Sequence, residues 1–301
     1  MAGGNPHYQE RVNRVLDHIG QHLDGDLSLT HLAGIGCFSP FHFHRIFQAV
    51  TGETLNTHVR RVRLERAALL MKTSPRKRIT EVAIEAGFAG ASEFSRAFKS
   101  HFGKAPSAWD RRTPLENSKI CKAPEGLSYY SLEELENWGA NVEVHVTRFG
   151  GFRYVYNRIF APYGNSKLVD AYQALIQWLA DRGTSYQDVT FIGMSLDDPS
   201  VTPSENCRYD MGVAFPPGTA LPDSPSGLTI RDLQPQDVAS IHCVGDLGQV
   251  DRAWHYLYRV WLPSVAYEPA DLPAMEVFVR LPEEIGWETF DLKAVIPVAR
   301  L

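Results

Sequence analysis

The chain has 301 residues, 44% of them hydrophobic and 22% charged, which is typical of a folded globular protein of about two domains. No apolar stretch approaches the roughly 18–20 residues of a membrane span, and the first residues lack the basic and apolar regions of a signal peptide. The four cysteines lie far apart without a CxxC pair, which argues against a zinc-finger type of site and favours reduced thiols. We therefore expect a cytoplasmic protein with no membrane partner, no bound metal and no cofactor.

The net charge of −5 is unevenly distributed along the chain. Residues 1–120 hold 17 Lys and Arg against 11 Asp and Glu, together with eight of the eleven histidines. Residues 121–301 hold 13 against 24. A basic first part and an acidic second part suggest one module for a polyanion and another for a different partner, such as a cation.

Periodicity divides the chain in the same way. Apolar residues recur at helical spacing over 6–110, whereas 111–141 has two prolines and little sustained periodicity. Strand-like runs such as "VEVHVTRF" and "MEVFVRL" then alternate with helical stretches. We predict an all-α domain over 1–112, an irregular linker over 113–141, and an α+β domain over 142–301.

The stretch "CFSPFHFHRIF" (37–47) places polar donors between phenylalanines, directly after a short helical segment. Serine followed by proline, at Ser39 and Pro40, is a strong helix start, and the whole predicts a helix-turn-helix. Phe43 and Phe47 fall on the face of the second helix that packs on the domain. The donors on its other faces have the chemistry needed to read base edges in the major groove.

A similar stretch, "GFAGASEFSRAF" (87–98), returns about fifty residues later. The positions that correspond are Phe38 with Phe88, Phe43 with Phe94, Arg45 with Arg96, Phe47 with Phe98, and Gly52 with Gly103. The all-α domain is therefore predicted to contain two helix-turn-helix units.

With these two units, the joining stretch "THVRRVRLERAALLM" and the closing "EFSRAFKSHFGKAPSAW", region 6–110 resembles the AraC/XylS family of bacterial transcription regulators. The resemblance implies two recognition helices that enter successive major-groove segments of double-stranded DNA, about 34 Å apart. RNA polymerase is expected as a further partner, and the presence of two reading heads in one chain predicts binding as a monomer. The expected DNA contacts are Phe41, His42, His44, Arg45, Ser92, Ser95 and Arg96 toward the bases, and Arg60, Arg61, Arg63, Lys77, Arg78, Lys99 and Lys104 toward the phosphates.

The first turn departs from the pattern of this family. Cys37 stands where the second unit has Gly87. A non-glycine residue at positive φ costs roughly 1–2 kcal/mol, unless Gly36 allows the turn to rearrange.

The second half is also duplicated. "VDAYQALIQWL" (169–179) corresponds to "VDRAWHYLYRVWL" (250–262), and "CRYDMGVAFP" (207–216) corresponds to "ETFDLKAVIP" (288–297). Each copy is predicted as strand–helix–strand–strand, and two such copies leave a cleft where they meet. The doubled unit and the run "WLPSVAYEPADLPAMEVFVRLPEE" are similar to gyrase-inhibitor-like ligand-binding domains. Such domains occur alone or fused to DNA-binding modules as effector sensors.

Glu276 is the candidate centre of the effector site, because a carboxylate in the apolar strand "AMEVFV" is costly unless it has a partner. In a cleft it would offer one negative charge among aromatic side chains, which suits a lipophilic cation. The expected aromatic walls are Tyr156, Tyr209, Tyr258, Trp261 and Phe278, whereas Trp178 is expected in the core. An exposed Glu276, or one paired with Arg280 or Arg153, is the simpler alternative.

Two other functions remain open for the second half. Some gyrase-inhibitor-like relatives hydrolyse reactive small molecules with a glutamate and aromatic residues in the same cleft. The sequence offers no Ser-His-Asp or Cys-His arrangement, phosphate-binding glycine loop or metal constellation, so no catalytic residue is assigned and we predict a non-enzyme. The acidic half is also compatible with a module that binds a protein partner.

Overall fold

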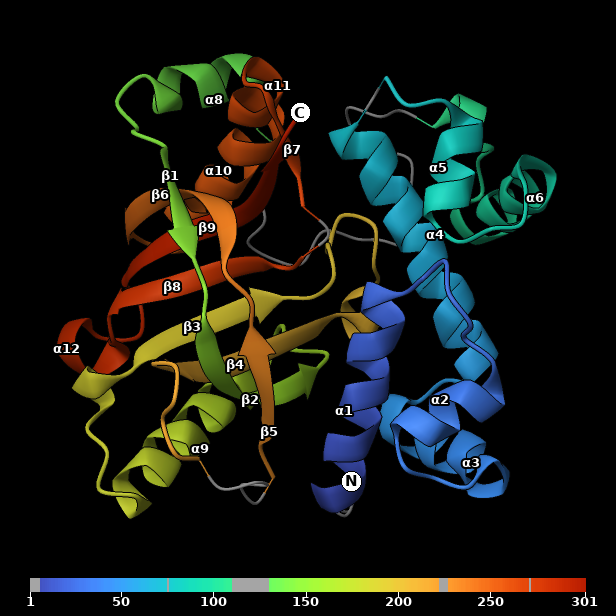
Figure 1. Ribbon diagram of the computed structural model, residues 1–301. Helices are drawn as coiled ribbons and strands as arrows, with labels where there is room; N and C mark the ends of the chain where they lie inside the picture. Colours follow the sequence, from blue (N-terminus) through green and yellow to red (C-terminus); the bar gives the residue numbers. More distant parts are fainter. Residues whose placement is uncertain (1–5, 75, 110–129, 222–226, 271) are drawn as a thin grey trace. The chain divides into compact units, whose positions relative to one another are not determined.

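The computed structural model describes residues 6–74, 76–109, 130–221, 227–270 and 272–301. The chain divides into two compact units, one of residues 1–122 with the short segments 198–203 and 224–229, and one of the remaining residues (Figure 1). Within the described residues, no helix is both long enough and apolar enough to cross a bilayer.

The first unit is helical, as predicted. Its elements are α1 (Pro6–Gln21), α2 (Leu29–Ile35), α3 (Pro40–Thr51), α4 (Leu55–Thr73), α5 (Ile79–Glu85), α6 (Ala91–Phe102) and the short 3₁₀ turn η1 (Pro106–Ala108). The pairs α2–α3 and α5–α6 form the two helix-turn-helix units, and α4 runs between them in Figure 1.

The internal repeat is visible in the packing of aromatic rings. In the first helix-turn-helix, Phe43 lies 5.8 Å from Phe38 and 5.7 Å from Phe47, measured between ring centroids. The corresponding rings Phe88, Phe94 and Phe98 follow one another at 5.3 Å. All of these rings are buried, so the shared phenylalanines hold each recognition helix against its unit.

Helix boundaries follow from local sequence. Ser39 caps α3 and Pro40 is its first residue, as predicted, although the Ser39 side chain makes no capping hydrogen bond. Both recognition helices end at a glycine with left-handed backbone, Gly52 (φ 80°) and Gly103 (φ 76°). Glycine adopts this conformation without the penalty that a Cβ brings.

The second unit contains a nine-stranded sheet in the order β1-β6-β9-β8-β3-β4-β2-β5, with β7 added on β9, as far as the described residues show. The strands are β1 (His145–Phe149), β2 (Phe152–Phe160), β3 (Thr190–Ser195), β4 (Arg208–Phe215), β5 (Thr229–Leu233), β6 (Gln236–Gly245), β7 (Tyr267–Pro269), β8 (Ala274–Arg280) and β9 (Phe290–Arg300). The helical elements are α8 (Leu132–Gly139), α9 (Lys167–Asp181), η2 (Tyr186–Asp188), η3 (Ser204–Asn206), α10 (Leu247–Tyr256), the π turn η4 (Leu257–Trp261), α11 (Leu262–Ser264) and α12 (Pro282–Ile285).

The predicted repeats are present as β2–α9–β3–β4 and β6–α10–β8–β9. They meet where β3 pairs with β8, at the middle of the sheet. The strand that precedes each repeat is exchanged, because β1 pairs with β6 and β5 pairs with β2. The α+β fold class is confirmed, and the exchange is a feature that the repeat pattern did not predict.

The predicted linker needs a correction at its end. Residues 110–129 lie outside the described residues, but part of 113–141 forms α8 rather than irregular chain. Ser131 and Glu134 make a capping box, Leu135 is buried, and the Trp138 indole N–H donates to Gln249 Oε1 over 3.1 Å. The Ser-x-x-Glu capping signal was present in the sequence and was missed.

Candidate nucleic-acid interface and effector site

The N-terminal half of α3 presents its polar side chains to solvent. His42, His44 and Arg45 are exposed, and the Phe41 side chain is 73% exposed. The exposed Phe41 ring is accessible to a partner beside these polar donors. The structure therefore places the four predicted residues of α3 together on the accessible side of that helix.

Helix α6 repeats the arrangement at equivalent positions. Ser92, Arg96 and Lys99 are exposed and Ser95 is partly buried, while Phe94 anchors the opposite face. The residues that correspond between the two helices are Phe41 with Ser92, His42 with Glu93, His44 with Ser95, and Arg45 with Arg96. The two accessible faces thus share an arginine and differ at the other three positions.

Arg61 does not belong to this surface, and its prediction as a phosphate contact is corrected. Its side chain is only 6% exposed. It donates to Glu53 Oε1 over 2.5 Å and to Glu65 Oε2 over 2.9 Å, and Glu53 also binds His58 Nδ1. The arginine and histidine hold the pKa of Glu53 at about 2, against the opposing effect of burial. These ion pairs hold α4 to the preceding turn and keep the Arg61 guanidinium buried, away from the surface that a DNA phosphate would reach.

The first turn keeps the left-handed backbone in spite of its cysteine. Cys37 has φ 54°, which matches Gly87 at φ 82°. Gly36 does not rearrange the turn; it is there because a Cβ would approach Phe38 Cδ2 to 2.7 Å. Arg11 of α1 donates to the carbonyls of Gly36 (2.7 Å) and Cys37 and stacks on the Phe38 ring at 3.7 Å, which stabilises the strained turn.

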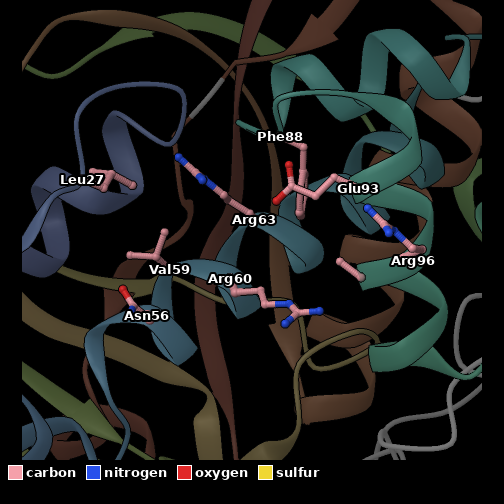
Figure 2. Close-up of a pocket in the computed structure, with 9 residues that line it drawn as sticks. Leu27, Asn56, Val59, Arg60, Arg63, Phe88, Glu93 and Arg96 are labelled. Atoms are coloured by element: carbon pink, nitrogen blue, oxygen red, sulfur yellow. The ribbon is translucent and has the colours of Figure 1, made fainter.

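A hollow of about 550 Å³ lies within the helical unit, beside α4 and α6 (Figure 2). Its lining combines apolar side chains with charged ones, namely Leu27, Asn56, Val59, Arg60, Arg63, Phe88, Glu93, Arg96 and Ala97. Arg60 and Arg96 are exposed, and Figure 2 shows the arginines around Glu93. Three guanidinium groups against one carboxylate give the hollow a positive balance, which suits a phosphodiester.

In the second unit, Glu276 sits on β8 at the junction of the two repeats. It faces Gly193 of β3 on one side and Ala294 of β9 on the other. The Tyr209 hydroxyl donates to Glu276 Oε2 over 2.5 Å. Gly193 makes this contact possible, because a Cβ there would lie 2.5 Å from Tyr209 Cζ and overlap the hydroxyl.

The surroundings of Glu276 disfavour its charge. Burial raises the pKa of its carboxyl, and hydrogen bonds from Tyr209 and Trp254 oppose that rise. Burial also raises the pKa of Tyr209, and the nearby Glu276 adds to the effect. Glu276 itself keeps part of its surface accessible. A partly desolvated carboxylate with few donors has unsatisfied attraction for a cation.

Most of the predicted aromatic walls gather on the same face of the sheet as Glu276. Tyr258, Trp261 and Phe278 are partly buried against the core that α10, β6 and β9 form there. Trp254 belongs to this group as well, and the sequence analysis missed it. The signal was available, because residues 254, 258 and 261 follow helical spacing, and the π turn after α10 changes the direction of the last two.

Tyr156 is the exception, and its prediction as a wall of the same site is wrong. It lies opposite Gly212 on β4, whereas Tyr209 lies opposite Ile159. Because side chains alternate along a strand, Tyr156 points to the other face of the sheet. There it is fully buried and stacks on Tyr154 at 5.3 Å.

That other face is closed by a buried ion pair. Arg158 donates to both carboxylate oxygens of Asp210 over 2.7 Å, and both side chains are fully buried. Arg231 of β5 lies 3.3 Å from the same carboxylate and over the Tyr156 ring at 4.9 Å. The exchanged strand β5 is thereby fixed to the first repeat, and this face serves structure.

Within the described residues, no three His, Cys, Asp or Glu side chains gather as a metal site requires. The acid–aromatic group around Glu276 and the accessible faces of α3 and α6 are the two candidate sites.

Comparison with known families gives a match in each unit. Residues 32–112 match the helix-turn-helix domain family, and residues 143–299 match the GyrI-like small molecule binding domain family. The second match spans more than half of the chain.

Curated relatives resemble the first unit. The right origin-binding protein of Escherichia coli (strain K12) is 31% identical over 123 residues, which are 41% of this chain and 42% of that protein. The transcriptional regulator Rob of Salmonella typhimurium is 33% identical over 123 residues, with the same coverage. Regulatory protein SoxS of the same species is 30% identical over 105 residues, which are 35% of this chain and 97% of SoxS. The chain thus spans about two fifths of the length of the first two relatives.

Solved structures are similar to each unit in turn. The DNA-binding domain of AdpA in complex with a target DNA is 25% identical, covers 33% of this chain and 89% of its own, and has a TM-score of 0.32. The EcmrR C-terminal domain is 11% identical, covers 54% of this chain and 99% of its own, and has a TM-score of 0.42.

Proposed function

We propose that this chain, which belongs to the GyrI-like small molecule binding family and contains an AraC-type helix-turn-helix domain, is a bacterial transcription regulator controlled by a lipophilic cation. Residues 1–112 bind double-stranded DNA, and residues 142–301 bind the effector, with α8 joined to α10 of the same unit through Trp138 and Gln249.

DNA binding is supported by the repeated accessible face of α3 and α6. In each helix buried phenylalanines hold one side, and an exposed arginine occupies the same position of the other side. Arg45 and Arg96 make bidentate contacts to guanine in this proposal, with the neighbouring side chains selecting adjacent bases. Arg60 and Lys99 contact phosphates and position the protein without specifying sequence.

Effector binding is supported by a single observation, the contact of the Tyr209 hydroxyl with the Glu276 carboxylate at the junction of the repeats. The carboxylate attracts a cation, and Trp254, Tyr258, Trp261 and Phe278 provide aromatic surface beside it. Cation–π contact and charge pairing together favour a cation with an apolar body over a small inorganic ion.

Regulation requires that the effector distinguish two states of the protein. A ligand that binds the DNA-bound and free forms equally changes nothing, so its affinity must differ between them. RNA polymerase is the expected partner of the DNA-bound form, and the cytoplasm is the expected compartment. The relatives in hand are named as regulators rather than enzymes, which favours sensing over hydrolysis.

The test is a titration of the full chain with tetraphenylphosphonium, followed by calorimetry. We expect saturable binding that weakens about tenfold or more in Glu276→Gln, as expected for loss of a charge-assisted contact. Glu143→Gln, a substitution at a side chain that is 81% exposed, serves as the control with the same loss of charge.

Three outcomes would count against the proposal. Absence of binding by the wild type favours a protein-binding module. Equal binding by Glu276→Gln shows that a cation site exists but that its acid is elsewhere. Consumption of a reactive ligand, detected by mass spectrometry, favours the hydrolase.

A further inference from the structure

Arg63 occupies the point at which the two helix-turn-helix units approach each other. It lies on α4, the helix that belongs to neither recognition unit, and it is partly buried. Its Nε donates to the carbonyl oxygen of Leu23 over 2.9 Å. Leu23 is buried and directly follows α1, which packs against α2 and α3, so this hydrogen bond connects α4 to the first helix-turn-helix.

The turn of the second helix-turn-helix, between α5 and α6, approaches the same carbonyl. A Cβ at Gly87 would lie 2.8 Å from both Arg63 Nε and the carbonyl carbon of Leu23. Gly87 is the turn residue between α5 and α6, and it has no side chain to hold these groups apart. Van der Waals contact therefore joins the Arg63 side chain to the backbone of both helix-turn-helix units, at Leu23 and at Gly87.

Charge links the same three parts. Burial lowers the pKa of the Arg63 guanidinium, while Glu93 and Asp24 attract its charge and oppose that effect. Glu93 belongs to α6, and Asp24 follows Leu23 in the first unit. Figure 2 shows Arg63 and Glu93 on neighbouring walls of the hollow. One side chain thus interacts with both reading heads.

A hollow lies beside this contact. Among the described residues, Leu27 lines it from the α2–α3 side and Phe88 from the α5–α6 side. Apart from the close approach of Gly87 to Leu23, the described side chains leave this side of α4 open. The hydrogen bond and charges of Arg63 therefore add a restraint between the two helix-turn-helix units.

We propose that Arg63 is a positioning residue that fixes the orientation of α6 relative to α3 and thereby selects the spacing between the two DNA segments that the protein accepts. This inference rests on the proposed DNA-binding function. Each base pair added between the segments moves the second one by about 3.4 Å and rotates it by about 34°, so a rigid pair of reading heads discriminates between spacings.

The test compares Arg63→Met with Arg60→Met. Both variants lose one positive charge from α4 and from the lining of the hollow, but Arg60 is exposed and makes no hydrogen bond in the described structure. The probe is the duplex that the wild type selects from a randomised library, together with versions lengthened or shortened by one base pair. Because Arg60 is a proposed phosphate contact, Arg60→Met should weaken binding to all duplexes alike and keep the wild type's loss of about tenfold at the altered spacings. Arg63→Met should reduce this ratio to about threefold or less.

A second measurement needs no DNA and covers the case that Arg63→Met folds poorly. Spin labels at Ala49→Cys of α3 and Ser100→Cys of α6, both exposed and at equivalent positions, report the separation of the heads. Cys37→Gly and Cys121→Ser remove the competing thiols. The distance distribution should broaden in Arg63→Lys, which keeps the charge and loses the planar donor, and remain narrow in Arg60→Met.

An unchanged spacing profile in Arg63→Met, or an unchanged distance distribution in Arg63→Lys, would overturn the positioning role and leave DNA binding intact. Failure of the wild type to select any duplex would instead contradict the proposed function itself. The two failures are therefore distinguishable.

Discussion

Two glycines of the helical unit have nearly the same backbone conformation but different surroundings, and alanine should lower stability by different amounts at each. Gly52 ends α3, and Gly87 lies in the turn between α5 and α6. Gly87 has φ 82° and Gly52 has φ 80°, so alanine at either position meets the same intrinsic strain. Their surroundings differ. At Gly52 a Cβ finds no atom within 4 Å, whereas at Gly87 it lies 2.8 Å from the Leu23 carbonyl carbon and from Arg63 Nε.

The magnitude follows from these two contributions. A left-handed backbone costs a non-glycine residue about 1–2 kcal/mol, and the stiffer unfolded chain returns about 0.5–1 kcal/mol. We therefore expect Gly52→Ala to destabilise the protein by about 1 kcal/mol. Gly87→Ala adds an overlap with backbone atoms that cannot rotate away, and overpacking of this kind costs about 1–3 kcal/mol more. Its total should be about 2–4 kcal/mol.

The assay is urea unfolding of the full chain, followed by far-ultraviolet circular dichroism, which reports the helical unit most strongly. The difference between the two variants removes the strain that they share and leaves the crowding at Gly87. A difference below about 0.5 kcal/mol would refute the close approach of Leu23, Arg63 and Gly87, because overpacking in a rigid site costs more than that. It would also weaken the positioning role of Arg63.

Three further predictions follow from the same geometry. Cys37→Gly should stabilise the helical unit by about 1 kcal/mol in the same urea assay, because it relieves the strain at φ 54°, and a loss of stability would contradict this. Burial, and then the charges of Arg61 and Arg60, lower the pKa of His101 to about 4. Between pH 6.5 and 4 the unfolded chain therefore binds a proton that folded His101 does not, so the free energy of unfolding should fall as pH decreases through this range. Discounted for solvent screening, the loss is about 2 kcal/mol, and in His101→Gln the free energy of unfolding should depend less on pH across this range. Glu276 has a raised pKa, so at a pH above the ordinary glutamate pKa of 4.5 its charge opposes folding. Glu276→Gln should therefore raise the free energy of unfolding at neutral pH, and this gain should disappear below about pH 4.5. No gain at pH 7 would contradict this.

The local features of the DNA-binding unit could be read from sequence because they depend on neighbouring residues. Serine before proline begins α3, glycine ends α3 and α6, and the repeated phenylalanines identify the packed face of each recognition helix. Arg61 could not be placed in this way. The i,i+4 spacing of Arg61 and Glu65 indicates one ion pair, but the second partner, Glu53, depends on how the turn before α4 folds back.

The effector unit shows the same division. The carboxylate of Glu276 was found because an acid within an apolar strand is costly wherever that strand lies. Tyr156 was misplaced because alternation along β2 gives two faces and does not say which of them carries the site. The choice is made by strand pairing, which puts Tyr209 and Glu276 on one face and Tyr156 on the other.

By itself, the sequence determined the fold class, the two duplications and the start of α3, since these follow from periodicity, capping and composition. Only the tertiary structure decided which of those residues meet. The exchange of β1 and β5, the contact of Tyr209 with Glu276 across Gly193, and the meeting of Arg63 with Leu23 and Gly87 join distant positions: His145 and Ser240 are 95 residues apart, Tyr209 and Glu276 are 67 apart, and Leu23 and Arg63 are 40 apart. The physical reason is that such contacts depend on register, on the face a side chain takes and on the absence of a Cβ at one glycine, and none of these is a property of a local stretch of chain.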